Sequence, residues 1–189
     1  MAPGVSLFSV NAILILSADD GSRVFAKYMP NAIANSQPGG LADVKTQKLF
    51  EKGLLEKTAK QSGDIILYDN QIVLYKQESD LMLYLVGGTQ ENEILLYNAL
   101  LALRDSLHLL FRQSVDKRTV VENYDLVCLA IDEIVDDGII LETDPTIIVQ
   151  RVSKAPAQDV NRIDLSEQGV NNLAQLGRAK LTDWLRQGL

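Results

Sequence analysis

The sequence predicts an α+β domain in which a five-stranded, mainly antiparallel sheet is flanked by helices. Two strand-like segments come first, a helix follows, three closely spaced strands come next, and only helices remain. Each amphipathic element must bury its apolar side, and helices on both faces of one sheet are the economical packing. At 189 residues and 47% hydrophobic, the chain is long enough for one sizeable core. We therefore predict one domain over residues 1–153, followed over 154–189 by a linker and a C-terminal amphipathic helix.

The first two strands are expected to form a hairpin. Residues 5–16 are apolar enough for a buried strand, and no basic region precedes them as it would in a signal peptide. The ADDG stretch at 18–21 has the residues of a turn, and Gly21 can adopt a positive φ there. Residues 23–29 then alternate with a period of two, which is typical of a strand.

A polar loop leads to a helix over about 44–60, with Asp43 as its N-cap. Gly53 costs roughly 1 kcal/mol in a helix relative to alanine. We therefore expect Gly53 to permit close approach of this helix to the sheet.

Three short apolar segments over 64–68, 72–76 and 81–86 are separated only by turn residues. Such spacing predicts an antiparallel meander. The rest of the chain is predicted to be helical. The expected helices run from Thr89 or Asn92 to about residue 112, from about 121 to 137 before Gly138, from Pro145 to near Val152, and from Ser166 onward.

Composition limits the function classes. A formal charge of −7 is unsuited to the binding of nucleic acid, because phosphate binding needs clustered Lys and Arg. The single cysteine, Cys128, fits a reducing compartment. The longest apolar run, residues 94–103, is short of the ~20 residues that cross a bilayer. These features predict a cytoplasmic protein whose membrane contact is indirect.

The segment LAIDEIVDDG at 129–138 places four carboxylates within six residues. At helical spacing the apolar residues share one face, and the acids diverge on the opposite one, as on a solvated helix. A metal site needs oxygens that converge, and catalytic carboxylates need a cleft. Contact of the acids with a basic partner is a further alternative. We predict neither metal nor cofactor.

Other catalytic residues are equally poorly supported. His108 is the only histidine and lies between helical polar residues, so no triad is evident. Cys128 has no cationic neighbour in sequence that would lower its pKa, and a packed thiol is the simpler interpretation. Gly87 and Gly88 lack the spacing and the lysine of a phosphate loop. The sequence therefore predicts a protein that is not an enzyme.

The helix near residues 92–112 is more apolar than one buried face requires. Ile94, Leu101 and Leu109 lie near Asn98 and Asp105, on the side opposite its main apolar stripe. A helix that is apolar nearly all round is buried on more than one side, either by other helices of the chain or by another protein. The terminal helix, with Leu181 and Trp184, presents the same alternative. We select these five residues as candidate partner-binding residues.

The runs ENEILLYNALLALRDSL, VDKRTVVEN and LAIDEIVDDGIILETDPTIIVQRV closely resemble the zeta-subunit family of coatomer, the COPI vesicle coat. The resemblance extends over nearly the whole chain. The wider pattern is also similar to the sigma subunits of clathrin adaptors, which remain the alternative. Both groups have the longin-like fold, which agrees with the order of elements above.

This resemblance implies a noncatalytic coat subunit held by the trunk of the large gamma subunit, gamma-COP. It implies recruitment of the complete coatomer complex to the cytoplasmic side of Golgi membranes and vesicles by Arf-family GTPases, in retrograde Golgi-to-ER and intra-Golgi transport. Sigma subunits use an asparagine to bind dileucine signals, and Ala102 occupies that position here. Cargo binding is therefore not implied.

Overall fold

The computed structural model describes residues 7–30, 41, 43–59, 63–112 and 114–153. The described elements are strands β1 (Val10–Ser17), β2 (Arg23–Tyr28), β3 (Ile65–Tyr68), β4 (Gln71–Glu78), β5 (Leu81–Gly88), β6 (Val135–Asp136) and β7 (Ile139–Ile140), and helices α2 (Val44–Thr58), α3 (Glu93–Phe111), α4 (Lys117–Glu122), α5 (Tyr124–Ile134) and α6 (Pro145–Val152).

The main sheet has the order β2-β1-β5-β4-β3, and every neighbouring pair is antiparallel. The predicted meander is confirmed: β3, β4 and β5 are joined by two-residue turns at 69–70 and 79–80. Asp69 and Asn70 both have positive φ, as a tight hairpin turn requires. Pairing of β1 with β5 places the N-terminal hairpin beside this meander, and these two strands are buried along their whole length.

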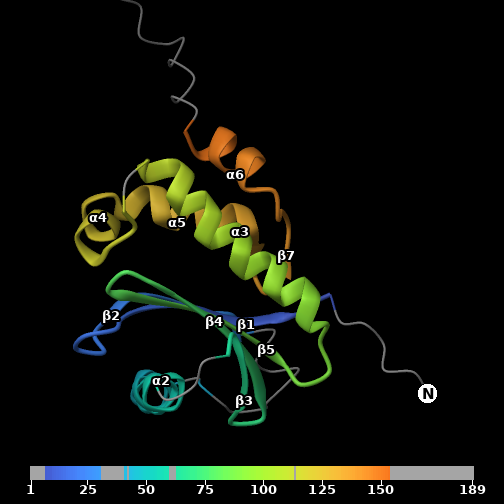
Figure 1. Ribbon diagram of the computed structural model, residues 1–189. Coiled ribbons are helices and arrows are strands. Elements are labelled where there is room, and N and C mark those ends of the chain that lie inside the picture. Colours follow the sequence, from blue (N-terminus) through green and yellow to red (C-terminus); the bar gives the residue numbers. More distant parts are fainter. Residues whose placement is uncertain (1–6, 31–40, 42, 60–62, 113, 154–189) are drawn as a thin grey trace, which may run out of the picture. The chain divides into compact units, whose positions relative to one another are not determined.

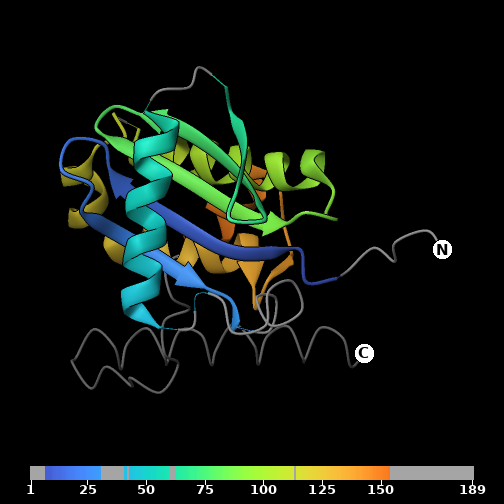
Figure 2. The same ribbon diagram turned by 90° about the horizontal axis from the view of Figure 1, so that it is seen from below.

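Helices cover both faces of the sheet, as the sequence predicted (Figure 1). On one face, α3, α5 and α6 pack over a core that includes Leu83 and Leu85 of β5. The alternate residues of the same strand, Tyr84 and Val86, belong to a second core beneath α2. Figure 2 shows α2 crossing the strands on this second face. The period of two along each strand therefore separates two apolar layers.

Helix α3 is the main element of the first layer. Asn92 caps it, accepting hydrogen bonds from the backbone N–H groups of Ile94 and Leu95. By length and composition α3 alone among the described helices could cross a membrane. Its buried face nevertheless packs on the sheet, where a Cβ on Gly87 would come within 2.5 Å of Leu96 Cδ1. The absence of a Cβ at Gly87 lets α3 approach β5, so its apolar character serves the core.

The helix predicted over 121–137 is wrong in its bounds. Asn123, with φ −120° and ψ 36°, separates α4 from α5, and α5 ends at Ile134. The next residues form the β6–β7 hairpin around Asp137 and Gly138, whose φ angles are 45° and 87°. An Asp-Gly pair with two positive φ angles is the preferred two-residue hairpin turn. This local preference ends the helix three residues early.

The last described helix follows the prediction closely. Asp144 accepts hydrogen bonds from the backbone N–H groups of Thr146 and Ile147, and Pro145 opens α6. Its buried residue Ile148 joins the core under α3 and α5. The predicted linker and helix over 154–189 lie outside the described residues.

Candidate partner-binding surface

The structure places three of the five candidate partner-binding residues on α3. Ile94 is 72% exposed and Leu109 is 47% exposed, whereas Leu101 is half-buried. Leu181 and Trp184 lie outside the described residues. The described helices therefore leave Ile94 and Leu109 exposed, and they cover Leu101 in part.

The position of each residue follows from the helical phase. Leu96, Leu100, Leu103 and Leu107 form the face of α3 that is buried on the sheet. Helices α5 and α6 pack against the flank of α3, where Ala99, Ala102 and Ser106 are buried. Small side chains allow this approach. Ile94 points away from both contacts, so its exposure is a consequence of its phase.

Further exposed apolar residues were not predicted from the sequence. Leu95, Ala102 and Leu109 are spaced seven positions apart, so they lie along one line of α3. Ala102 is buried, whereas Leu95 and Leu109 are exposed. Leu129 was assigned to the acidic segment, and Leu141 lies just beyond the unpredicted β6–β7 hairpin. The exposed fractions are 39% for Leu95, 51% for Leu129, 57% for Leu141 and 38% for Ile147 in α6.

Charged residues separate the apolar ends of α3. Arg104 pairs with Asp105 at 2.7 Å and lies 3.9 Å from Glu78 of β4. Nε2 of His108 is 3.0 Å from Oε2 of the same Glu78 carboxylate. This arrangement attaches α3 to β4, and it gives His108 the surroundings of a structural hydrogen bond.

The predicted acidic stripe faces outward, as expected. Two of its carboxylates have cationic partners: Lys27 of β2 pairs with Asp132, and Arg151 of α6 donates to Glu133 at 3.0 Å. These pairs join α5 to neighbouring elements. The described residues contain no group of three or more side chains suited to hold a metal ion.

Cys128 is half-buried beside the core of the α3 layer. Burial raises the pKa of its thiol, and the carboxylates of Asp132 and Asp125 act in the same direction. The neutral thiol is therefore favoured, which agrees with a packing role rather than a nucleophilic one.

The arrangement is that of a small α+β domain with exposed apolar residues on a surface helix. The family model for the clathrin adaptor complex small chain matches residues 9–159. One chain of a structure described as "Homology model of the full-length AP-3 complex in a stretched open conformation" shares the fold, with a TM-score of 0.56 at 18% identity, over 90% of this chain and 98% of that one.

Similar proteins of known name indicate the family more narrowly than the family model does. The chain is 40% identical to coatomer subunit zeta of Saccharomyces cerevisiae over 187 residues, or 98% of each chain. It is 40% identical to human coatomer subunit zeta-1 over 176 residues, covering 93% of this chain and 92% of that one. Probable coatomer subunit zeta-A of Dictyostelium discoideum is 36% identical over 184 residues. The chain belongs to the clathrin adaptor small-chain family and, within it, to the coatomer zeta subunits.

Proposed function

We propose that this chain is a noncatalytic small subunit of the COPI coat, held by the trunk of gamma-COP. In that role it supports retrograde Golgi-to-ER and intra-Golgi transport as part of the coatomer complex. Its place would be the cytoplasm and the cytoplasmic side of Golgi and vesicle membranes, reached through the complex and its Arf-family GTPase. The observation that carries the proposal is 40% identity along 98% of a coatomer zeta subunit.

The exposed apolar residues of α3 support the proposal of a large protein partner. Ile94 and Leu109 expose apolar side chains near opposite ends of α3, about 22 Å apart at 1.5 Å per residue. Full burial of one such side chain contributes roughly 1.5–3 kcal/mol. A partner that covers both ends must therefore be an extended surface, such as the trunk of a large subunit.

Co-purification of the full chain with gamma-COP tests this interface. We expect Ile94→Asp combined with Leu109→Asp to lose the complex, because two charges would be buried against apolar partner groups. The melting temperature of the variant should stay close to that of wild type, since both side chains are exposed in the free chain.

The matched control is Leu49→Asp combined with Val44→Asp. These residues are 64% and 55% exposed and lie on α2, on the other side of the sheet. This control should retain gamma-COP. Retention of gamma-COP by the Ile94 and Leu109 variant, with normal melting, would place the interface elsewhere.

The choice of large subunit tests the assignment to COPI. Wild-type chain should capture gamma-COP in preference to the large chains of clathrin adaptors when both are present. Preferential capture of a clathrin-adaptor large chain would identify a sigma-type subunit instead.

A further inference from the structure

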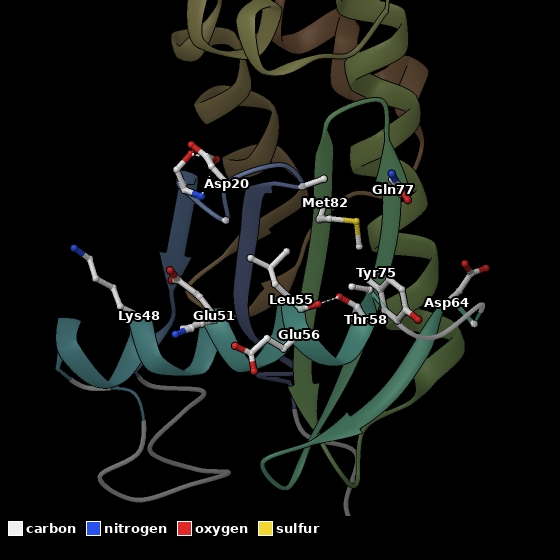
Figure 3. A pocket seen from close by; sticks show the side chains of 16 residues that line it. Asp20, Lys48, Glu51, Leu55, Glu56, Thr58, Asp64, Tyr75, Gln77 and Met82 are labelled. Atoms are coloured by element: carbon white, nitrogen blue, oxygen red, sulfur yellow. Dashed lines mark hydrogen bonds between the residues drawn. The ribbon is translucent and has the colours of Figure 1, made fainter.

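Strand β3 forms one edge of the main sheet, and β2 forms the other (Figure 2). Figure 3 shows Asp64 next to the start of β3. The sequence of β3, IILY, contains no charged residue and no proline, and its register with β4 is regular. Native proteins usually protect an edge strand with charged side chains, proline or a bulge. Strand β3 itself carries none of these protections.

The opposite edge of the sheet is protected. Arg23 and Lys27 of β2 pair with Glu51 and Asp132, and an irregularity interrupts the register between β1 and β2. Charged side chains and an irregular register both discourage pairing with another strand. The two edges of one sheet therefore differ, and β3 is the edge suited to a further strand.

The backbone of β3 presents two residues outward. Tyr75 donates from its N–H to the carbonyl of Asp64 at 2.9 Å, so these two residues form a hydrogen-bonded pair. Hydrogen-bonded pairs alternate along an antiparallel ladder, and the next one is at Ile66. The N–H and C=O groups of Ile65 and Leu67 therefore point away from β4. No backbone hydrogen bond from another described segment reaches them.

The side chains of the same two residues are apolar and exposed. Ile65 is 47% exposed and Leu67 is 65% exposed. They lie on the α3 face of the sheet, since the residues opposite them on β4, Leu74 and Ile72, belong to the core beneath α3. Helix α3 packs over β5 and β4 and leaves both side chains at the β3 edge exposed.

These features together select the kind of partner. A helix or a lipid surface could cover Ile65 and Leu67, but neither would bond their outward N–H and C=O groups, and burial of those groups without partners is costly. A strand bonds both residues, and its side chains opposite them lie on the same face. Aliphatic residues are favoured at these alternate positions. On the α2 side Ile66 is already buried, so the intervening residues need not be apolar.

We propose that β3 accepts a sixth strand, supplied by an extended segment of another protein in which aliphatic and polar residues alternate. The added strand runs antiparallel to β3, as every neighbouring pair in this sheet does. Two of its aliphatic residues exchange backbone hydrogen bonds with Ile65 and Leu67 and pack on their side chains. The site uses neither Ile94 nor Leu109, so it does not depend on the proposed contact with gamma-COP.

The probe is a fluorescein-labelled heptapeptide of sequence KTVTITK, and fluorescence anisotropy measures its binding to the full chain. Saturable binding is expected. N-methylation of the valine and isoleucine nitrogens removes the two donors that face β3 and should weaken binding roughly tenfold or more. N-methylation of the last two threonine nitrogens instead places the methyl groups on the outer edge of the added strand. This control peptide should bind nearly as the unmodified one.

Lysine substitution tests the same edge on the protein. Ile65→Lys combined with Leu67→Lys should weaken the peptide roughly tenfold or more, because the apolar contact is lost and lysine discourages edge pairing. The control is Val44→Lys combined with Leu49→Lys, which changes the net charge equally at exposed residues of α2. It should bind nearly as wild type. The melting temperature of each variant is measured alongside and should stay close to that of wild type.

Amide hydrogen exchange of the wild-type chain gives a readout that needs no variant. The amides of Ile65 and Leu67 should exchange rapidly in the free chain and roughly tenfold or more slowly at saturating peptide. The amides of Ile66 and Tyr68 face β4 in the ladder, and their exchange should change much less.

Three results would overturn the proposal. The first is absence of saturable peptide binding. The second is equal weakening by the two N-methylation patterns, which would show that backbone pairing with β3 does not hold the peptide. The third is slow exchange of the Ile65 and Leu67 amides in the free chain, which would show that the edge is already paired. Dependence of that slow exchange on protein concentration would identify the occupant as a second copy of the chain.

Discussion

The hydroxyl oxygen of Tyr68 on β3 lies 2.1 Å from the position that a Cβ would occupy on Gly53 in α2. The ring of Tyr68 also packs against Phe50, with ring centroids 5.2 Å apart, and Lys57 lies over it. An edge strand is thus held by a helix through a contact that only glycine admits.

Gly53→Ala should therefore be less stable than wild type, although alanine normally stabilises a helix by ~1 kcal/mol over glycine. Overpacking costs about 1–3 kcal/mol, and this destabilisation is expected to exceed the gain in helix propensity. Urea unfolding of Gly53→Ala, Tyr68→Phe and the double variant measures the coupling. Removal of the hydroxyl should recover part of the lost free energy of unfolding. A Gly53→Ala variant more stable than wild type would show that the contact between Gly53 and Tyr68 is loose.

Much of the sheet could be predicted because strand length, period and turn residues are local properties. The close approach at Gly53 was predicted from one unfavourable residue in a helix and is confirmed. The end of the helix before Asp137 was not predicted correctly, because Val135 falls on the apolar face whether the segment is a helix or a strand. Hydrophobic period cannot separate these cases, and the Asp-Gly turn decides between them.

The ion pairs on the α2 side could not be predicted from the sequence for a different reason. Glu51, Asp64 and Asp20 pair with Arg23, Lys76 and Lys117, which are 12 to 97 positions away along the chain. Only the folded chain shows which charges are paired.

The β6–β7 turn provides a second test of backbone geometry. Gly138 has φ 87°, and its carbonyl accepts a hydrogen bond from the backbone N–H of Val10 at 3.0 Å. Gly138→Ala should lower the free energy of unfolding by about 1–2 kcal/mol, because an L-residue is strained in that region. Gly63 does not have a positive φ and has room for a Cβ, with its nearest neighbour at 3.8 Å. Gly63→Ala is therefore the control and should be neutral or stabilising. Equal effects at both positions would contradict the assigned turn.

Tyr84 should make stability depend on alkaline pH. It is fully buried, and its hydroxyl shares a 2.8 Å hydrogen bond with Thr58. Burial raises the pKa of Tyr84 from 10.0 to about 12. Because the folded-state pKa is the higher one, the contribution is complete below pH 10 and is lost as pH rises toward 12. At 1.36 kcal/mol per pKa unit, the total loss is roughly 3 kcal/mol.

Chemical unfolding of wild type and Tyr84→Phe between pH 8 and pH 12 measures this loss. The wild-type free energy of unfolding should fall more steeply above pH 10 than that of the variant. Other tyrosines with raised pKa values, including Tyr28 and Tyr75, contribute to both proteins, so the difference between them isolates Tyr84. Parallel curves would show that Tyr84 ionises without opposing the fold.

Glu51 allows a test of how a buried carboxylate is tolerated. It is 4% exposed and receives hydrogen bonds from Arg23 at 2.6 and 3.1 Å and from the Tyr28 hydroxyl at 2.8 Å. Arg23→Met removes the cation and leaves the carboxylate buried, a change that costs about 3 kcal/mol when a buried pair is broken. Replacing both partners, as Arg23→Met with Glu51→Met, removes the uncompensated charge as well. The double variant should therefore be more stable than Arg23→Met alone in urea unfolding at neutral pH. If the effects of Arg23→Met and Glu51→Met on the free energy of unfolding instead add, the carboxylate is solvated after loss of Arg23, and α2 has moved away from β2.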